Sequence, residues 1–146
     1  SQGVYEDKSG PVIKELVEEA GMEVIDCLIV PDEKSEIVKK LIHFSDQRQA
    51  DLIFTTGGTG FSKRDVTPEA TKQVVEREVP GIGEALRSYS MTITPKAMLS
   101  RQTAGIRGNT LIINLPGSPK ACRENIEYIM KPLKHGLGIL SGRESD

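Results

Sequence analysis

A glycine-rich stretch in the first half of the chain, residues 55–70, gathers groups that bind phosphate. Its three glycines allow positive φ and close approach of backbone N–H groups to an anion, and neighbouring threonines add hydroxyl donors. The stretch follows the apolar run 52–54 and leads into a helix start, and a helix N-terminus also attracts anions. We therefore predict a phosphate-binding loop formed by Thr56, Gly57, Gly58, Thr59 and Gly60.

Charged residues complete this loop. Lys63 and Arg64 are placed to neutralise phosphate charge, and Asp65 next to them offers carboxylate oxygen to a hard cation such as Mg²⁺. The alternative is a local ion pair between Arg64 and Asp65, or a capping role for Asp65 at the following helix. Thr67 is the predicted cap of that helix, with Pro68 at its first position. Beside the glycine loop, we favour Asp65 as a metal ligand and Lys63, Arg64 and Thr67 as further ligand contacts.

Spacing separates this loop from two familiar phosphate motifs. A dinucleotide-binding fingerprint needs Gly-x-Gly-x-x-Gly, and a Walker A loop needs Gly-Lys followed by Ser or Thr. Lys63 stands where the third glycine of the fingerprint would be, and Arg64 follows it. Glycine-rich turns also serve plain geometry, so the glycines alone leave a structural turn as an equal alternative.

Two further turns carry candidate ligand groups. Asp32, in the turn after the apolar run 22–30, is placed to supply a second carboxylate to a metal, although ordinary turn chemistry explains it equally well. Ser118 follows Pro116 and Gly117 at a predicted helix start. There it would either contact an anion or simply cap the helix.

Strand patterns and helix patterns alternate along the chain, which is typical of a three-layer α/β domain with a mostly parallel sheet. In such a sheet the loops that leave the carboxyl ends of strands line one crevice, so the turns at 31–33, 57–65 and 116–118 are expected to meet. The predicted helices cover 9–20, 35–48, 68–78, 84–89, 95–99 and 118–130, with a last helix from Pro132. The predicted strands cover 22–30, 51–55, 104–106 and 110–115.

Length and composition exclude several classes of protein. A chain of 146 residues fits a single domain over 1–146. A net charge of −2 and an aromatic content of 4% argue against nucleic acid as a partner. No apolar run approaches the roughly 20 residues that span a bilayer, so we expect no membrane contact and a cytoplasmic location. Cys27 and Cys122 lack neighbouring metal ligands and are expected in the core.

The chain resembles the MogA/MoaB family, which includes the G domains of plant molybdenum cofactor proteins and of animal gephyrin. The glycine loop is the most specific block of this resemblance, and further blocks agree in order along nearly the entire chain. These blocks are residues 6–11, 55–71, 99–101, 105–108 and 111–117.

The resemblance implies a molybdopterin adenylyltransferase, which transfers AMP from ATP to the terminal phosphate of molybdopterin and releases pyrophosphate. It implies Mg²⁺ as the cofactor, with Asp65 and Asp32 in metal and phosphate handling. It also implies a homotrimer and, less specifically, nucleotide or pterin contacts from Ser100, Arg101 and the turn 116–118. A noncatalytic pterin-binding or trimeric scaffold domain is the alternative within the same family.

Family members also begin with a hydrophobic strand ahead of the block at 6–11. The present sequence starts at Ser1 without such a strand. The resemblance therefore implies one further sheet position that these residues leave open, and we expect a truncated amino terminus rather than a reorganised fold.

Overall fold

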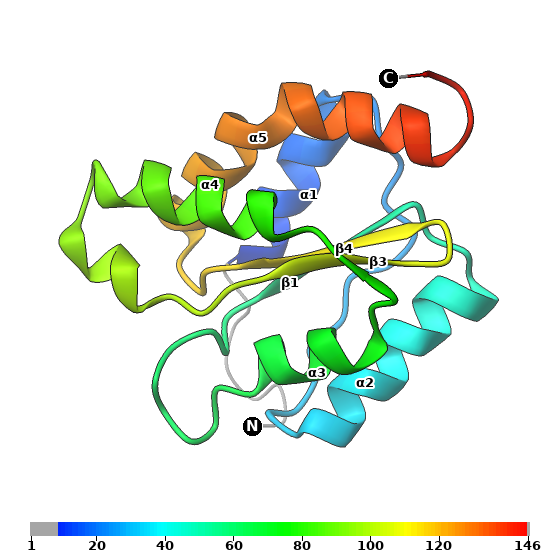
Figure 1. Cartoon of the computed structure of the whole chain (residues 1–146). Helices are drawn as coiled ribbons and strands as arrows, with labels where there is room; N and C mark the ends of the chain where they lie inside the picture. The colour runs from blue at the N-terminus through cyan, green and yellow to red at the C-terminus, as the bar shows by residue number, and fades with distance from the viewer. Residues whose placement is uncertain (1–8, 146) are drawn as a thin grey trace.

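A β-sheet lies between two layers of helices in the computed structural model, which describes residues 9–145 (Figure 1). The α-helices are α1 (Ser9–Glu19), α2 (Lys34–Ile42), α3 (Thr67–Val74), α4 (Pro80–Met91) and α5 (Pro119–Leu140). A π-helical turn η1 (His43–Gln47) and a 3-10 helix η2 (Pro95–Leu99) complete the helical elements. The strands are β1 (Leu52–Thr56), β2 (Arg77–Glu78), β3 (Ala104–Arg107) and β4 (Thr110–Leu115).

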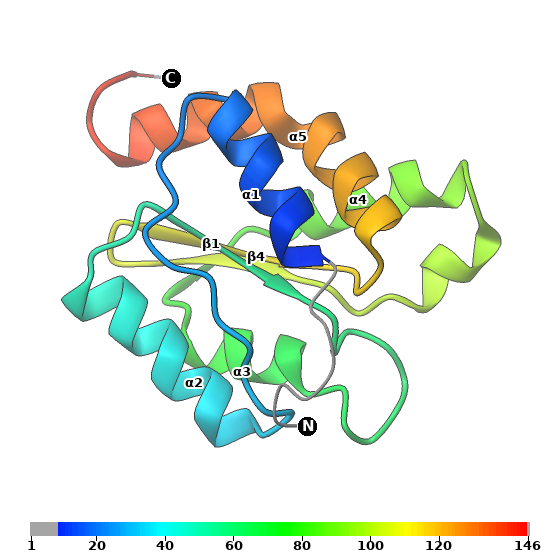
Figure 2. The same ribbon diagram turned by 180° about the vertical axis from the view of Figure 1, so that it is seen from behind.

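Helices α1, α4 and α5 cover one face of the sheet, and α2 and α3 cover the other face (Figures 1 and 2). The predicted three-layer α/β architecture is therefore confirmed. Among residues 9–145, no helix combines the length and the apolar character needed to cross a lipid bilayer.

The sheet is mixed rather than mostly parallel. The strand order among the described residues is β1-β4-β3-β2, and of these pairs only β1–β4 is parallel. Strands β3 and β4 form the predicted hairpin, whose turn contains Gly108 at φ 58°, and the two-residue strand β2 adds a second antiparallel pair. A hairpin turn reverses the chain at once, which forces antiparallel pairing at this side of the sheet.

Segment 22–30 does not form the predicted buried strand. It runs from α1 to α2 alongside β1 as an open chain and pairs with no strand among the described residues (Figure 2). Its side chains Ile25, Leu28 and Ile29 are 43%, 45% and 44% exposed. A strand needs a neighbour about 4.7–4.9 Å away to satisfy its N–H and C=O groups. Here a cavity separates the segment from β1, so β1 is not at pairing distance from it.

Several helix boundaries also differ from the prediction. Residues Pro119–Leu140 form one helix, with Pro132 inside it, instead of two helices that meet at 130–132. The proline lies on an exposed turn, whereas Ile129 and Leu133 on the packed side stay buried, so packing outweighs the lost hydrogen bond. Helix α3 ends at Val74 rather than at 78, because Arg77 and the next residue pair with β3 instead.

The centre of the sheet holds a buried polar residue, Asn114 of β4, which is fully shielded from solvent. Its Nδ2 group donates to Thr55 Oγ1 and to Thr71 Oγ1, each at 2.9 Å. Its Oδ1 accepts a hydrogen bond from the backbone N of Thr103 at 3.1 Å. Asn114 therefore ties the end of β1 and helix α3 to the central strand, and this fixes the base of the glycine loop that lies between them.

Candidate functional site

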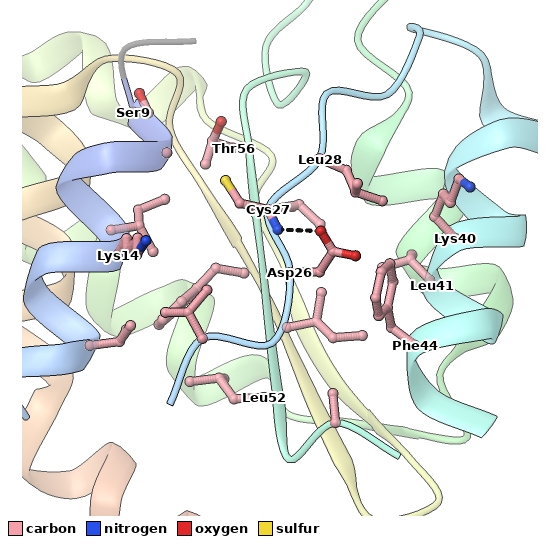
Figure 3. A pocket seen from close by; sticks show the side chains of 18 of the residues that line it. Ser9, Lys14, Asp26, Cys27, Leu28, Lys40, Leu41, Phe44, Leu52 and Thr56 are labelled. Atoms are coloured by element: carbon pink, nitrogen blue, oxygen red, sulfur yellow. Dashed lines mark hydrogen bonds between the residues drawn. The ribbon is translucent and has the colours of Figure 1, made fainter. Parts of the chain in front are cut away.

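A large cavity of about 1310 Å³ opens between segment 22–30 and β1 and extends to the carboxyl end of that strand. Figure 3 shows Cys27 of the segment on the side of Thr56 and Leu28 on the side of Lys40. The walls are mostly apolar, and the end at the carboxyl edge of the sheet is polar. That polar end is lined by Asp32, Thr56, Gly57, Gly58, Ser62, Arg64, Asp65, Thr67 and Gly117. Residues from all three predicted turns therefore meet at one edge, as expected.

The glycine loop adopts a conformation that requires glycine at its start. Gly57 and Gly58 have φ of 79° and 69°, values that L side chains rarely adopt. Gly57 also lies against Gly117, since a Cβ added to Gly57 would stand 3.8 Å from the Gly117 Cα. Among the described residues, the backbone N–H groups of Gly58, Thr59 and Gly60 have no hydrogen-bond acceptor. Three consecutive unengaged donors form a concavity suited to an anion.

Thr67 has a different local role from the predicted one. It is the first residue of α3 rather than its cap, the cap position is Val66, and no side-chain hydrogen bond closes the helix end. The Thr67 side chain instead packs over Gly58, where any added Cβ would collide with Thr67 Oγ1, and its backbone N donates to Gly58 O at 3.2 Å. Thr67 lines the cavity and packs against the glycine loop at Gly58.

Asp65 presents one carboxylate oxygen that the loop does not use. Its Oδ2 accepts a hydrogen bond from the backbone N of Ser62 at 2.9 Å. Its Oδ1 accepts no hydrogen bond from residues 9–145, and within that range Asp65 forms no ion pair with Arg64 and does not cap α3. Mg²⁺ binds proteins through one or two carboxylates and keeps its other positions for water and phosphate. The side chain of Asp65 therefore fits this ion.

The remaining charged candidates surround the same polar end. Asp32 is exposed and lines the cavity from the side of α2. Arg64 lines it as well, whereas Lys63 lies outside the lining at the exposed tip of the loop. Neither cation makes a salt bridge within the described part of the chain, so both charges remain available to an anion. That part contains no cluster of three or more His, Cys, Asp or Glu, so any metal here would rest on two carboxylates at most.

Ser100 and Arg101 lie outside the large cavity. They border a separate hollow of about 370 Å³ next to helices α3 and α4. Ser100 Oγ donates to Gln102 Oε1 at 3.0 Å, and the guanidinium of Arg101 contacts the glycine loop and Glu69. The hydrogen bond from Arg101 holds the pKa of the Glu69 carboxyl below its usual value. Nucleotide contacts from Ser100 and Arg101 remain a prediction. The position of both residues outside the large cavity does not favour it.

The residues of the turn after β4 have different roles. Gly117 lines the cavity, and its carbonyl accepts a hydrogen bond from Ser9 Oγ at 2.7 Å. Ser118 is the cap of α5, because its Oγ accepts from the backbone N of Ala121 at 3.1 Å. The carbonyl of Pro116 accepts a hydrogen bond from Cys122 Sγ at 3.0 Å. Gly117 is therefore part of the cavity lining. Ser118 caps the helix, which is the second of the two roles considered for it from the sequence.

Sequence reasoning missed two residues of the site. Ser9 was expected only as the first residue of the predicted helix 9–20, yet it lines the cavity and joins α1 to the turn after β4. It belongs to the block 6–11 of the family resemblance, which was the available signal, although residues 6–8 lie outside the described range. Cys27 was expected in the core, but it is exposed at the cavity because segment 22–30 is not covered, while Cys122 is buried as predicted.

Comparison with known proteins identifies the family and the fold. Residues 1–135 match the protein-family profile described as "Probable molybdopterin binding domain". A Helicobacter pylori (strain J99) protein named molybdopterin adenylyltransferase is 46% identical over 144 residues, covering 97% of this chain and 82% of that protein. A gephyrin of Dictyostelium discoideum is 42% identical over 153 residues, covering 98% of this chain and 21% of that protein. The crystal structure of the molybdopterin biosynthesis enzyme MoaB of Thermus thermophilus superposes with a TM-score of 0.90 at 45% identity, covering 96% of this chain and 88% of that one.

Proposed function

The chain belongs to the family of molybdopterin-binding domains, and we propose that it is a molybdopterin adenylyltransferase of molybdenum cofactor biosynthesis. In the proposed reaction, an oxygen of the terminal phosphate of molybdopterin attacks the α-phosphorus of ATP. A new P–O–P bond forms, the bond from the α-phosphorus to the pyrophosphate oxygen breaks, and pyrophosphate leaves. The observation that carries this proposal is the glycine loop, because Gly58, which begins its run of unengaged N–H groups, and the Asp65 carboxylate both line the polar end of a large cavity.

The residues of the loop bind and orient the phosphates in this mechanism. The N–H groups of Gly58, Thr59 and Gly60 donate to phosphate oxygens, and Arg64 offsets their negative charge. Phosphoryl transfer needs little covalent chemistry from the protein, so positioning and electrostatic stabilisation account for most of the catalysis. Mg²⁺ held by Asp65 and Asp32 would neutralise charge on the phosphates. No covalent intermediate with the protein is required.

The cavity separates β1 from segment 22–30, and its polar end holds the candidate ligand groups of the glycine loop. We propose that the enzyme acts in the cytoplasm.

A noncatalytic pterin-binding or trimeric scaffold domain is the second candidate function. The observation that favours assembly is a set of exposed apolar side chains on and after α4, including Met91, Ile93, Met98 and Leu99. We propose a homotrimer, which light scattering on the eluting protein would test directly. A monomer at all concentrations would remove this part of the proposal.

The decisive experiment measures pyrophosphate release. Purified protein is incubated with molybdopterin, ATP and Mg²⁺, and with each component omitted in turn. We expect release that depends on all three. Ligand binding and assembly without turnover would instead establish the scaffold alternative.

A further inference from the structure

Segment 100–103 is a rigid support beside the glycine loop. Gln102 is only 2% exposed, and its Nε2 donates to the carbonyl of Asn114 in the central strand at 2.9 Å. Arg87 of α4 reaches the same segment from the other side, and its Nη1 donates to the carbonyl of Gln102 at 2.6 Å. The backbone around residue 101 is therefore fixed by groups that belong to the core.

Arg101 projects from this support and holds the loop at several points. Its backbone N donates to the carbonyl of Thr59 at 2.8 Å. Its Nε donates to the carbonyl of Gly60 at 2.8 Å, and its Nη2 donates to the carbonyl of Asp65 at 2.6 Å. Its Nη1 donates to Glu69 Oε2 in the first turn of α3 at 2.5 Å. One side chain thus joins both ends of the loop tip to the helix that follows.

The direction of these bonds explains how the loop meets a ligand. A peptide group is planar and its C=O and N–H point in opposite directions, so a protein group that binds the carbonyl also sets the direction of the next N–H. Arg101 donates to the carbonyls of Thr59 and Gly60. The N–H groups in the same two peptide groups, those of Gly60 and Phe61, therefore point away from the arginine. The bond to the Asp65 carbonyl likewise fixes the backbone that carries the candidate metal ligand.

We propose that Arg101 is a positioning residue for adenylyl transfer, which holds the glycine loop in its anion-binding conformation and presents Asp65 to the cavity. This inference rests on the proposed function. It replaces the expectation of a nucleotide contact, because the guanidinium nitrogens of Arg101 already donate to the loop and to Glu69, outside the large cavity.

The geometry requires arginine rather than any cation. A guanidinium group presents its donors in a planar fork and can serve three acceptors at once, whereas an ammonium group is a compact point charge. Glu69 completes the arrangement by balancing the charge, but it touches neither Gly60 nor Asp65. Loss of the fork should therefore affect the loop more than loss of the Glu69 charge.

The test compares Arg101→Lys with Glu69→Gln and with the control Arg123→Lys. Arg123 of α5 pairs with Glu15 of α1 and with Glu127 of α5, and it lies outside both the loop and the cavity. Each variant is measured for melting temperature, for kcat and KM of pyrophosphate release, and for amide hydrogen exchange over residues 59–66, where the N–H groups of Ser62 and Asp65 are hydrogen-bonded within the loop. A misplacement on the scale of an ångström typically costs about 100-fold in rate, so we expect kcat of Arg101→Lys to fall about 10- to 100-fold.

We expect the same variant to keep its melting temperature, to change its KM for ATP by less than kcat, and to exchange faster over 59–66. Glu69→Gln should show a smaller fall in kcat, and Arg123→Lys none. Unchanged loop exchange in Arg101→Lys, or a Glu69→Gln effect as large as that of Arg101→Lys, would overturn the inference. If the parent releases no pyrophosphate, the proposed function fails, and loop exchange still decides whether Arg101 holds the loop.

Discussion

The two parallel strands β1 and β4 show how differently the halves of this sheet are built. All six residues of β4 are buried, and the strand has a neighbour on each side. Within the described range 9–145, strand β1 has a neighbour only at β4, its residues are half-buried or exposed, and its other side faces the cavity. The β4 half is thus a closed scaffold, and the β1 half is the open region where ligand groups collect.

This difference separates residues that stabilise the fold from residues that bind. In the closed half, polar groups such as Asn114 and Gln102 have partners inside the protein. In the open half, one oxygen of Asp65 and three loop N–H groups have none among the described residues. Unengaged polar groups at a cavity are available to substrate, whereas unengaged groups in a core would cost stability.

The strongest test removes a ligand group from the open half. We expect Asp65→Asn to lower the rate of pyrophosphate release about 1,000-fold, which corresponds to about 4 kcal/mol, because a neutral amide is a poor ligand for Mg²⁺. The free energy of unfolding should change little, since the side chain fills no core space. Steady-state kinetics and urea unfolding of the same sample measure both quantities. Parent-like turnover would remove Asp65 from the mechanism.

A matched pair of isoleucines compares the two strands directly. Ile53 of β1 and Ile112 of β4 are register partners in the same apolar cluster, but Ile112 is fully buried and Ile53 borders the cavity. We expect Ile112→Ala to lower the free energy of unfolding by about 3–4 kcal/mol and Ile53→Ala by about half as much, because Ile53 leaves less new empty space. Urea midpoints at constant m-value provide the measurement. Equal losses would mean that β1 is as closed as β4.

The two threonines that Asn114 contacts give a smaller comparison. Thr71 of α3 is fully buried, and Thr55 of β1 is half-buried. Replacing either by valine keeps the shape and removes one acceptor of the Asn114 amide. We expect a loss of about 1–2 kcal/mol for Thr71→Val and less for Thr55→Val, where water can replace the acceptor. Thermal unfolding of both variants checks the order, and the reverse order would contradict it.

Lowering the pH should increase local opening of residues 59–66, in the β1 half of the sheet, before it increases opening of β4. The pKa of Glu69 is lowered by its hydrogen bond from Arg101, so this pair stabilises the folded protein above the unfolded-state pKa, about 4.3. The contribution is lost as the pH falls through the lower folded-state pKa. Because both side chains are partly exposed, we expect less than about 1 kcal/mol. Amide exchange at decreasing pH, corrected for intrinsic rates, should rise over 59–66 before it rises in β4; simultaneous loss of protection would argue against this order.

The elements that the sequence predicted correctly carry their own local signals. The hairpin at 104–115 combines two apolar runs with a glycine turn, and the glycine loop lies between a strand and a helix start with proline at its first turn. Ser118 was placed at the start of a helix and is its cap. In each case neighbouring residues determine the structure, so no distant contact was needed to infer it.

The features that the sequence did not reveal depend on distant contacts. Segment 22–30 has the composition of a buried strand, yet pairing requires a neighbour that no local pattern can supply. Pro132 suggested a helix break, but packing of the buried face keeps α5 continuous. The contacts of Arg101 span 32 to 41 positions along the chain, and no spacing rule connects such residues. The loop was therefore predictable, whereas the group that holds it was not.

The contact between Gly57 and Gly117 has a further consequence for how this region tolerates change. The two backbones cross so closely that a side chain on either one would come within 4 Å of the other backbone. Because the two residues are in direct van der Waals contact, the energetic costs of substitutions at the two positions should not add. A double-mutant cycle with alanine would reveal this interdependence, and natural variation at one crossing point would be constrained by the residue at the other.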